Sequence, residues 1–357
     1  MFIIDAHEDL AWNIQTFERD YSRSALWIRA REAGTPAPAL NGNTLLGKAE
    51  WLLGRVGLIF STLFVAPAHR RLGGWDTQCY STASEAAALA SAQLDVYCQL
   101  AEAHPQFRMV ATQDDLEQVV ASWEPGLPLE NRRIGLVPLM EGADAIQEPE
   151  QAEGWFERGV RVVGLAWERT RYAGGTHEPG SLTPDGARLL GVMAGLGMIL
   201  DLSHMAEEAY FEALDRYTGV VIASHSNPRR FCPTARGLSD RMIVELAERD
   251  GVAGIVPYNA FLKPGWRKGD RKEDVTLIHV VDAIDHVCQV TGSARHVGLG
   301  TDFDGGFGVE HVPAEIDTIA DLLEIEPLLA ARGFSEEQIE AIYGGNWLRI
   351  LRAALPA

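Results

Sequence analysis

The stretch FIIDAHEDL, residues 2–10, joins a short apolar run to a group of ionisable side chains. Similar apolar, β-branched runs recur along the chain, and helix-like segments separate them. These runs are nearly continuously apolar, which is typical of strands covered on both faces. The eight predicted strands are Phe2–Ala6, Val56–Val65, Ile134–Met140, Val160–Ala166, Met198–Ser203, Val220–Ser224, Val252–Pro257 and Val297–Thr301.

The alternation of strands and helices predicts a parallel sheet, and eight such units favour a (β/α)8 TIM-like barrel. The alternative is an open, doubly wound α/β sheet. A weaker run, Phe107–Ala111, suggests an extra strand outside the main set. Two loop-like segments, Ala33–Gly47 and Arg169–Ser181, are expected to follow strands directly and to line the C-terminal face of the barrel. We predict a single barrel domain over residues 1–357, because α/β barrels of this size often form one domain.

The composition is that of an ordinary globular protein, with 46% hydrophobic and 23% charged residues. The formal net charge of −19 disfavours nucleic acid and anionic lipid as partners. The first residues lack a basic segment followed by a long apolar one, and no apolar run approaches the length of a membrane span. None of the four cysteines lies in a C-x-x-C pair. We therefore expect a cytoplasmic protein that does not bind membranes.

Five of the apolar runs end in residue types that bind metals. They are followed by His7 and Asp9, by Glu141, by His204, by His225 and by Asp302. Each residue alone is weak evidence, because a lone histidine at a strand end is more often a structural residue. In a barrel, however, all these strand ends meet on one face. Burying several carboxylates there is costly without a compensating positive charge, which a divalent metal supplies.

The residue types also indicate which ion binds. In His7-x-Asp9 the alternation of a strand points both side chains the same way, so one ion can take both. His204 and His225 come from neighbouring strands and can hold a second ion, with the two oxygens of Glu141 bridging the pair. Nitrogen and oxygen ligands without thiolate suit Zn²⁺ first, and Mn²⁺, Co²⁺ or Fe²⁺ less well. Such a site can activate water, and Asp302 lies where a proton shuttle is needed.

Five segments together resemble the motifs of the membrane (renal) dipeptidase family, dinuclear zinc metallopeptidases of the amidohydrolase superfamily. Their order and approximate spacing agree with those of the family. The segments are Asp5-Ala6-His7-Glu8-Asp9-Leu10, Met140-Glu141-Gly142, Asp201-Leu202-Ser203-His204, Ser224-His225-Ser226 and Gly300-Thr301-Asp302-Phe303-Asp304-Gly305.

The resemblance implies a role for each matched residue. It implies His7 and Asp9 on one zinc ion, His204 and His225 on the other, Glu141 as the bridge, and Asp302 on the bridging water. It also implies an arginine that binds the carboxylate of the substrate. Arg236 stands at that place, with Arg229 and Arg230 as nearby competitors. Finally, it implies a homodimer.

One position departs from the family. The family's L-T-H segment, whose histidine contacts the substrate, is replaced by Leu165-Ala166-Trp167. An indole N–H can donate a hydrogen bond but cannot carry a positive charge, so Trp167 puts carbonyl stabilisation and substrate range in question. Plain packing is the alternative role for Trp167. His177, in the following loop, is a second residue to examine.

The predicted function is a zinc-dependent dipeptidase that hydrolyses small dipeptides, including those with a C-terminal D-residue. One alternative is a dinuclear amidohydrolase that acts on another small amide, lactone or ester. The alternative of another class is a regulatory protein that binds metal without turnover, which Asp302 argues against. Asp304 is expected to be structural, and Asp5 and Asp201 to orient ligands. The run Lys263–Lys272 is expected to be a solvated loop unless Arg267 or Lys268 lines the pocket.

Overall fold

The computed structural model describes residues 2–357, and parallel strands form its centre. The central strands are β1 (Ile3–Glu8), β2 (Val56–Phe64), β6 (Ile134–Glu141), β7 (Val162–Gly164), β8 (Ile199–Asp201), β9 (Val221–Ile222), β10 (Ala253–Ile255) and β11 (Val297–Leu299). Their order in the sheet is β10-β11-β1-β2-β6-β7-β8-β9. A parallel bridge between Ala223, after β9, and Ala253 joins the two ends of this order, so the sheet closes into a barrel.

Three shorter strands lie outside this set. Strand β5 (Phe107–Met109) pairs with the beginning of β6, and β3 (Ala66–Pro67) pairs with β4 (Cys79–Tyr80) in a small separate sheet. All eight predicted barrel strands and the predicted extra strand are therefore confirmed. Several barrel strands are shorter than predicted, because the chain leaves the sheet soon after each strand reaches the C-terminal face.

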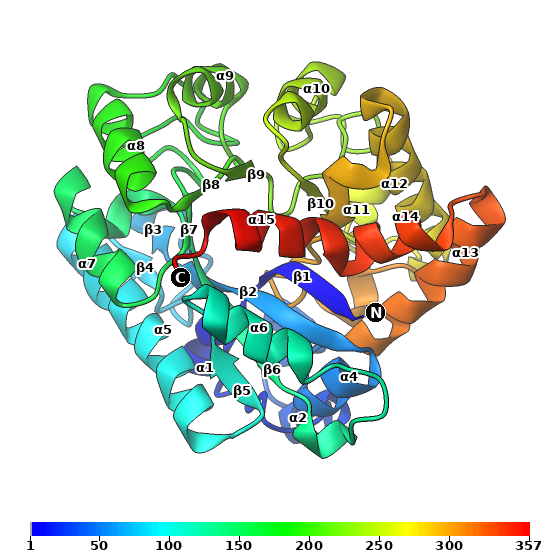
Figure 1. Cartoon of the computed structure of the whole chain (residues 1–357). Helices are drawn as coiled ribbons and strands as arrows, with labels where there is room; N and C mark the ends of the chain where they lie inside the picture. Colours follow the sequence, from blue (N-terminus) through cyan, green and yellow to red (C-terminus); the bar gives the residue numbers. More distant parts are fainter. Residues whose placement is uncertain (1) are drawn as a thin grey trace.

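Helices surround the barrel, as Figure 1 shows. They are α1 (Leu10–Phe17), α2 (Ala25–Glu32), α3 (Ala37–Asn41), α4 (Lys48–Leu53), α5 (Ala83–Ala103), α6 (Gln113–Ala121), α7 (Ala152–Glu157), α8 (Pro184–Leu196), α9 (Glu207–Arg216), α10 (Asp240–Glu248), α11 (Asn259–Leu262), α12 (Leu277–Thr291), α13 (Ile325–Arg332), α14 (Glu336–Glu340) and α15 (Asn346–Ala354). Polar side chains cap two of these helices: Thr82 and Glu85 form a capping box on α5, and Thr183 caps α8. No helix within residues 2–357 has both the length and the hydropathy of a membrane span.

Helix α15 closes the end of the barrel opposite the ligand-bearing strand ends. In Figure 1 it crosses the centre of the view in front of the strands. Its Trp347 is fully buried, packs on Phe60 with 5.6 Å between ring centroids, and donates a hydrogen bond of 3.0 Å to the carbonyl of Leu299. A Cβ atom at Gly298 would lie 2.3 Å from the indole nitrogen, so only glycine at this position leaves space for the ring of Trp347. The barrel interior is therefore a packed core at this end.

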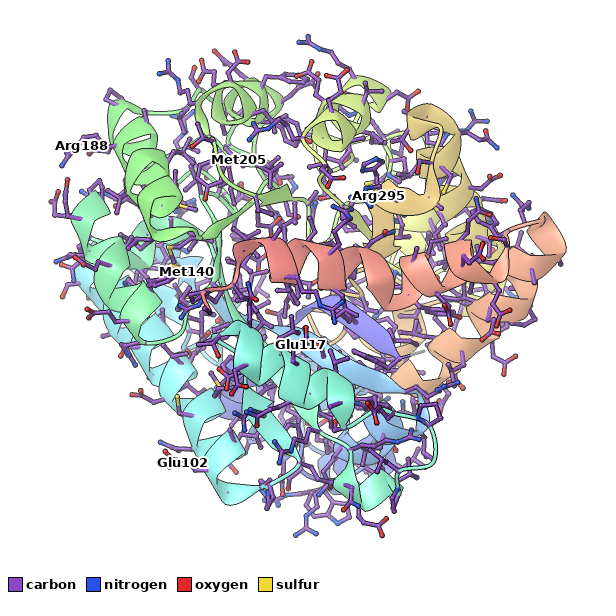
Figure 2. All side chains as sticks on the ribbon, viewed as in Figure 1. Glu102, Glu117, Met140, Arg188, Met205 and Arg295 are labelled. Atoms are coloured by element: carbon purple, nitrogen blue, oxygen red, sulfur yellow. The ribbon has the colours of Figure 1, made fainter. Side chains whose placement is uncertain are left out.

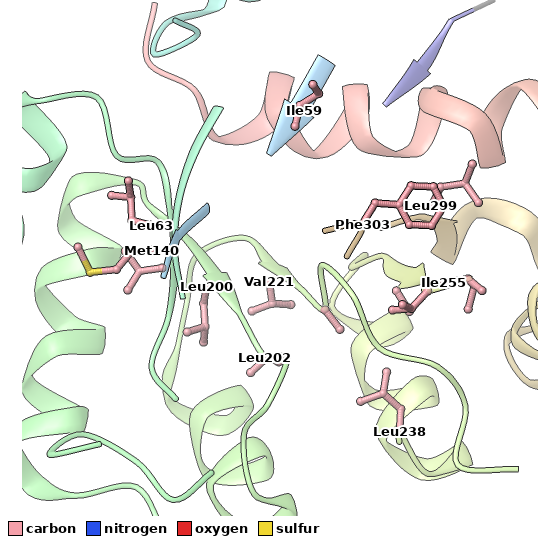
Figure 3. Packing of buried hydrophobic residues seen from close by; sticks show 14 of the residues in the cluster. Ile59, Leu63, Met140, Leu200, Leu202, Val221, Leu238, Ile255, Leu299 and Phe303 are labelled. Carbon is pink, nitrogen blue, oxygen red and sulfur yellow. The ribbon is translucent and has the colours of Figure 1, made fainter. Parts of the chain in front are cut away.

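A second apolar layer lies between the strands and the surrounding helices. Figure 3 shows part of it, including Ile59, Met140, Leu200 and Leu299, which point away from the barrel interior. Because both faces of each strand are covered, the strands read as continuous apolar runs in the sequence. Charged side chains lie outside this layer; Arg188 and Glu102 project from the outer helices in Figure 2.

One predicted loop lies elsewhere than expected. The segment Ala33–Gly47 does not follow β1 directly, because α1 and α2 come between them, and it contains the short helix α3. The prediction failed because α2 has little amphipathic pattern. The segment still reaches the C-terminal face, where Leu40 and Asn41 line a cavity.

Candidate functional site

An irregularity in β1 directs His7 and Asp9 into the mouth of the barrel. The pairing of β1 with β2 shifts register between Asp5 and Glu8. As a result Glu8 faces outward, where its carboxylate accepts a hydrogen bond from the indole of Trp51. His7 and Asp9 face the opposite way. The predicted shared orientation of these two side chains is therefore present, although the register shifts around His7, between Asp5 and Glu8.

Six of the predicted residues meet at the C-terminal ends of the strands. Three overlapping groups have ligand atoms that all lie within 4.8 Å of one another: His7 with Asp9 and Glu141, Glu141 with His204 and His225, and His7 with His225 and Asp302. Glu141 is central, because one carboxylate oxygen lies 3.4 Å from Nε2 of His7 and the other 3.1 Å from Nε2 of His204. The geometry places Glu141 between the two predicted ligand pairs.

The pKa values of the clustered side chains are shifted in directions that indicate an imbalance of charge. Burial raises the pKa of Asp302 well above its usual value and that of Asp9 to about 6. Burial also lowers the pKa of His204 to about 4. In His7, burial opposes the charged form, but the carboxylates of Glu141, Asp9 and Asp302 together outweigh it and raise the pKa to about 9. The histidines alone do not balance the buried carboxylates, which is the condition that a divalent cation relieves.

The donor atoms fit such a cation. Nε2 of His7 is buried and has no hydrogen-bond partner in the described chain, although a buried polar atom normally has one. Nε2 of His204 and Nε2 of His225 lie 3.0 Å apart and both lie close to Glu141. Imidazole nitrogen and carboxylate oxygen in a closed group suit a divalent transition metal better than Ca²⁺ or Mg²⁺.

Neighbouring polar side chains orient the histidines. The hydroxyl of Ser224 lies 2.7 Å from Nδ1 of His225 and 3.3 Å from Nδ1 of His7, and it also hydrogen-bonds to the carboxylate of Asp201. The hydroxyl of Thr176 lies 3.2 Å from Nδ1 of His204. Such contacts fix the ring orientation of each ligand. Asp201 thus acts on two histidines through Ser224.

Asp302 and Asp304 have different surroundings. Asp302 faces the cavity, and both Asp302 and Asp304 have a left-handed backbone, with φ of 57° and 64°. Asp304 is fully buried and accepts hydrogen bonds from Arg19 at 2.9 Å and Tyr21 at 2.6 Å. The structure therefore gives Asp304 the structural position that the sequence predicts for it.

A cavity of about 470 Å³ opens above the cluster, a size typical of small-ligand sites. Arg236 lines it and is buried; its guanidinium donates to Oγ of Ser226 at 2.7 Å and to the carbonyl of His225. Its competitors lie elsewhere: Arg229 pairs with Glu207 at 2.7 Å, and Arg230 is exposed outside the cavity lining. Only Arg236 of the three is placed to meet a ligand over the cluster.

Trp167 forms part of the same cavity wall. Its ring packs edge-on against Phe64, with 5.0 Å between centroids, and lies 6.3 Å from the ring of His204. The wall is therefore apolar and aromatic where the family's histidine would stand. Of the two basic candidates in the Lys263–Lys272 run, Lys268 lines the cavity and Arg267 does not.

Several cavity residues were missed by the sequence reasoning. Glu168 is buried beside Trp167; its carboxylate lies 2.6 Å from Nδ1 of His177 and 3.4 Å from the guanidinium of Arg70. His177 does line the cavity. Asp76, in the segment after β2, also lines it and was missed. The one sequence signal for Glu168 is its position directly after Trp167 at a strand end. Its contacts could not be predicted, because its partners lie in other loops.

Comparisons with known proteins agree with this geometry. The sequence model described as membrane dipeptidase (peptidase family M19) matches residues 1–356. An uncharacterised protein of the pqqA 5′ region in Klebsiella pneumoniae is 31% identical over 233 residues, covering 62% of this chain and 83% of that protein. Dipeptidase tcpJ of Claviceps purpurea is 34% identical over 174 residues, covering 48% of this chain but only 38% of its own length.

A solved structure shares the fold. It is a metallopeptidase from Rhodobacter sphaeroides, liganded with a phosphinate mimic of the dipeptide L-Ala-D-Ala. The similarity has a TM-score of 0.78 at 21% sequence identity, and it covers 99% of both chains. The predicted barrel of the metal-dependent hydrolase type is thereby confirmed.

Proposed function

This chain belongs to the membrane dipeptidase family, peptidase family M19, a family of metal-dependent dipeptidases, and we propose that it hydrolyses the amide bond of small dipeptides at the cluster around Glu141. The observation that carries the proposal is the convergence of three histidines and three carboxylates beneath a cavity of about 470 Å³. A phosphinate mimic of a dipeptide bound to a protein of the same fold supports it.

We propose two divalent ions per chain, Zn²⁺ first, with Mn²⁺, Co²⁺ or Fe²⁺ as alternatives. His7 and Asp9 would hold one ion, His204 and His225 the other, and Glu141 both. Bound there, the ions supply an activated water and polarise the scissile carbonyl. The all-nitrogen-and-oxygen donor set supports this choice of metals.

The chain's own residues then divide the remaining work. The carboxylate of Asp302 accepts a proton from the attacking water and transfers it to the leaving amine. Its position on the cavity side of the cluster supports this role. Arg236 binds the terminal carboxylate of the substrate, because a guanidinium matches a carboxylate with two parallel hydrogen bonds. Trp167 narrows the pocket beside the scissile bond and makes it apolar.

The test combines metal content with turnover. Protein purified without chelator should contain about two equivalents of divalent metal and should hydrolyse L,L- and L,D-dipeptides, which amine release measures. His225→Ala should lose both metal and turnover. Retained metal without hydrolysis of any dipeptide would contradict the proposed function and favour a binding protein.

The homodimer and the cytoplasmic location expected from the sequence stay predictions. Size-exclusion chromatography with light scattering measures the first, and fractionation of cells that produce the protein measures the second. A monomer would leave the proposed reaction intact, because all six predicted residues of the cluster come from one chain.

A further inference from the structure

The substrate cavity has two opposite sides, which the barrel topology defines. Strands β2 and β9 lie four places apart in the order of the eight barrel strands, so they stand across the barrel from each other. Arg236 belongs to the loop after β9. The end of β2 contributes Phe64 to the cavity lining, and the segment after β2 contributes Arg70 and Asp76. A dipeptide whose carboxylate binds Arg236 and whose amide bond lies over the cluster therefore directs its N-terminal residue toward this segment.

Asp76 in this segment is a buried carboxylate without a cation. It is 3% exposed, and none of the ion pairs within residues 2–357 includes it. Its Oδ2 accepts one hydrogen bond of 3.2 Å from the backbone N–H of Leu72, while its Oδ1 is buried with no hydrogen-bond partner in that part of the chain. A buried carboxylate oxygen without a hydrogen-bond partner is costly and uncommon in folded proteins.

The groups around Asp76 leave its carboxylate without an ion pair. The exposed Arg71 lies near the thiol of Cys79 but forms no ion pair with Asp76 within residues 2–357. The nearby thiol of Cys79 is neutral; burial, with Asp76 adding to it, raises the pKa of this thiol to about 11. Arg70, on the same cavity wall, is already paired with Glu168 at 3.4 Å and with Glu178 at 3.5 Å. The wall beside the N-terminal residue thus offers one carboxylate that forms no ion pair within the described residues.

We propose that Asp76 is a specificity-determining residue that binds the cationic side chain of a lysine or arginine at the N-terminal position of the dipeptide. The inference rests on the proposed function and deepens it by naming a substrate class. Binding the side-chain ammonium or guanidinium would satisfy Oδ1 and neutralise the buried charge. Leu72 at the rim is 72% exposed, so little packing opposes the entry of a long side chain.

The test compares substrates that differ only in charge. L-lysyl-L-alanine and L-norleucyl-L-alanine have side chains of similar length, so the ratio of their kcat/KM values isolates the ammonium. In the unmodified enzyme we expect kcat/KM for the lysyl substrate to be at least ~10-fold higher. A hydrogen bond between charged groups supplies enough free energy for a preference of this size. The reversed pair, L-alanyl-L-lysine and L-alanyl-L-norleucine, should show no such preference, because the C-terminal residue faces the other side.

Asp76→Asn keeps the size of the side chain and an oxygen for the N–H of Leu72, and it should reduce the lysyl preference at least ~10-fold, mainly through KM. Asp215→Asn removes the same charge from the exposed end of α9 and should keep the preference. The ratio in the unmodified enzyme tests the proposal even if a variant folds poorly.

Three results would overturn the proposal. Equal kcat/KM for the lysyl and norleucyl substrates would remove the cationic preference while leaving the dipeptidase function intact. Equal losses on both substrates in Asp76→Asn would place Asp76 at the α-ammonium group instead. No hydrolysis of any dipeptide by the metal-loaded enzyme would remove the proposed function and this inference together.

Discussion

Replacing Arg236 by methionine should remove the preference for a free C-terminal carboxylate. Arg236 is buried, and its guanidinium is held by Ser226 and the carbonyl of His225, so it is oriented before a substrate binds. A hydrogen bond to a charged group contributes about 1.5–3 kcal/mol, and 1.4 kcal/mol corresponds to a factor of ten. We therefore expect L-alanyl-L-alanine to exceed its C-terminal amide in kcat/KM by about 10- to 100-fold.

The assay is a cycle of four kcat/KM values, for the dipeptide and its amide with the unmodified enzyme and with Arg236→Met. The variant also loses its contacts to Ser226 and His225, which lowers the values for both substrates, but the ratio of the two substrates cancels that common effect. We expect the ratio to fall close to one, chiefly through a raised KM, because the carboxylate contact exists in both ground and transition states.

Arg230→Met is the matched control, since Arg230 is exposed and lies outside the cavity lining. It should leave the ratio as in the unmodified enzyme. If the dipeptide and its amide are hydrolysed equally well by the unmodified enzyme, Arg236 does not bind the carboxylate, and another small amide, lactone or ester becomes the better substrate class.

Four further outcomes are expected. Glu141→Gln should lower the metal content below two equivalents in elemental analysis, and full retention would contradict the bridge. Asp302→Asn should lower kcat at least ~10²-fold with metal still bound, whereas loss of metal would make Asp302 a ligand above all. Trp167→His should change the ranking of a dipeptide panel without abolishing turnover; an unchanged ranking would indicate plain packing. Trp347→Ala should lower the free energy of unfolding by about 4 kcal/mol, measured by denaturant titration, because it empties the end of the barrel and leaves the Leu299 carbonyl without its donor.

The strands were predictable from the sequence because a barrel strand is covered on both faces and must be apolar throughout. The predicted ligands also lie together, because the C-terminal ends of parallel strands meet on one face whatever the loops do. The register shift in β1 was not predictable, since it depends on how Asp5 and Glu8 pack against other parts of the chain. Helix α2 was missed for a related reason: its short sequence carries little amphipathic pattern.

The residues missed in the cavity share one property. Glu168 and Asp76 are placed by contacts between loops that lie far apart in the sequence, and no local pattern encodes such contacts. Arg236 could be selected only through the family resemblance, which implies an arginine shortly after the Ser224-His225-Ser226 segment. The structure adds that Arg229 is already engaged by Glu207, which only the folded chain reveals.

The pairing of β1 with β11 joins two parts of the site that lie far apart in the sequence. Thr301 donates from its backbone N–H to Asp5, a residue 296 positions earlier in the chain, and Asp302 follows at once. A ribosome makes His7 and Asp9 long before Asp302 exists, and pairings of such high contact order are slow to form. The proposed metal ligands all precede residue 226, but the proposed proton shuttle, Asp302, joins them only when β11 pairs with β1. We therefore expect the complete catalytic cluster to form only once the barrel has closed.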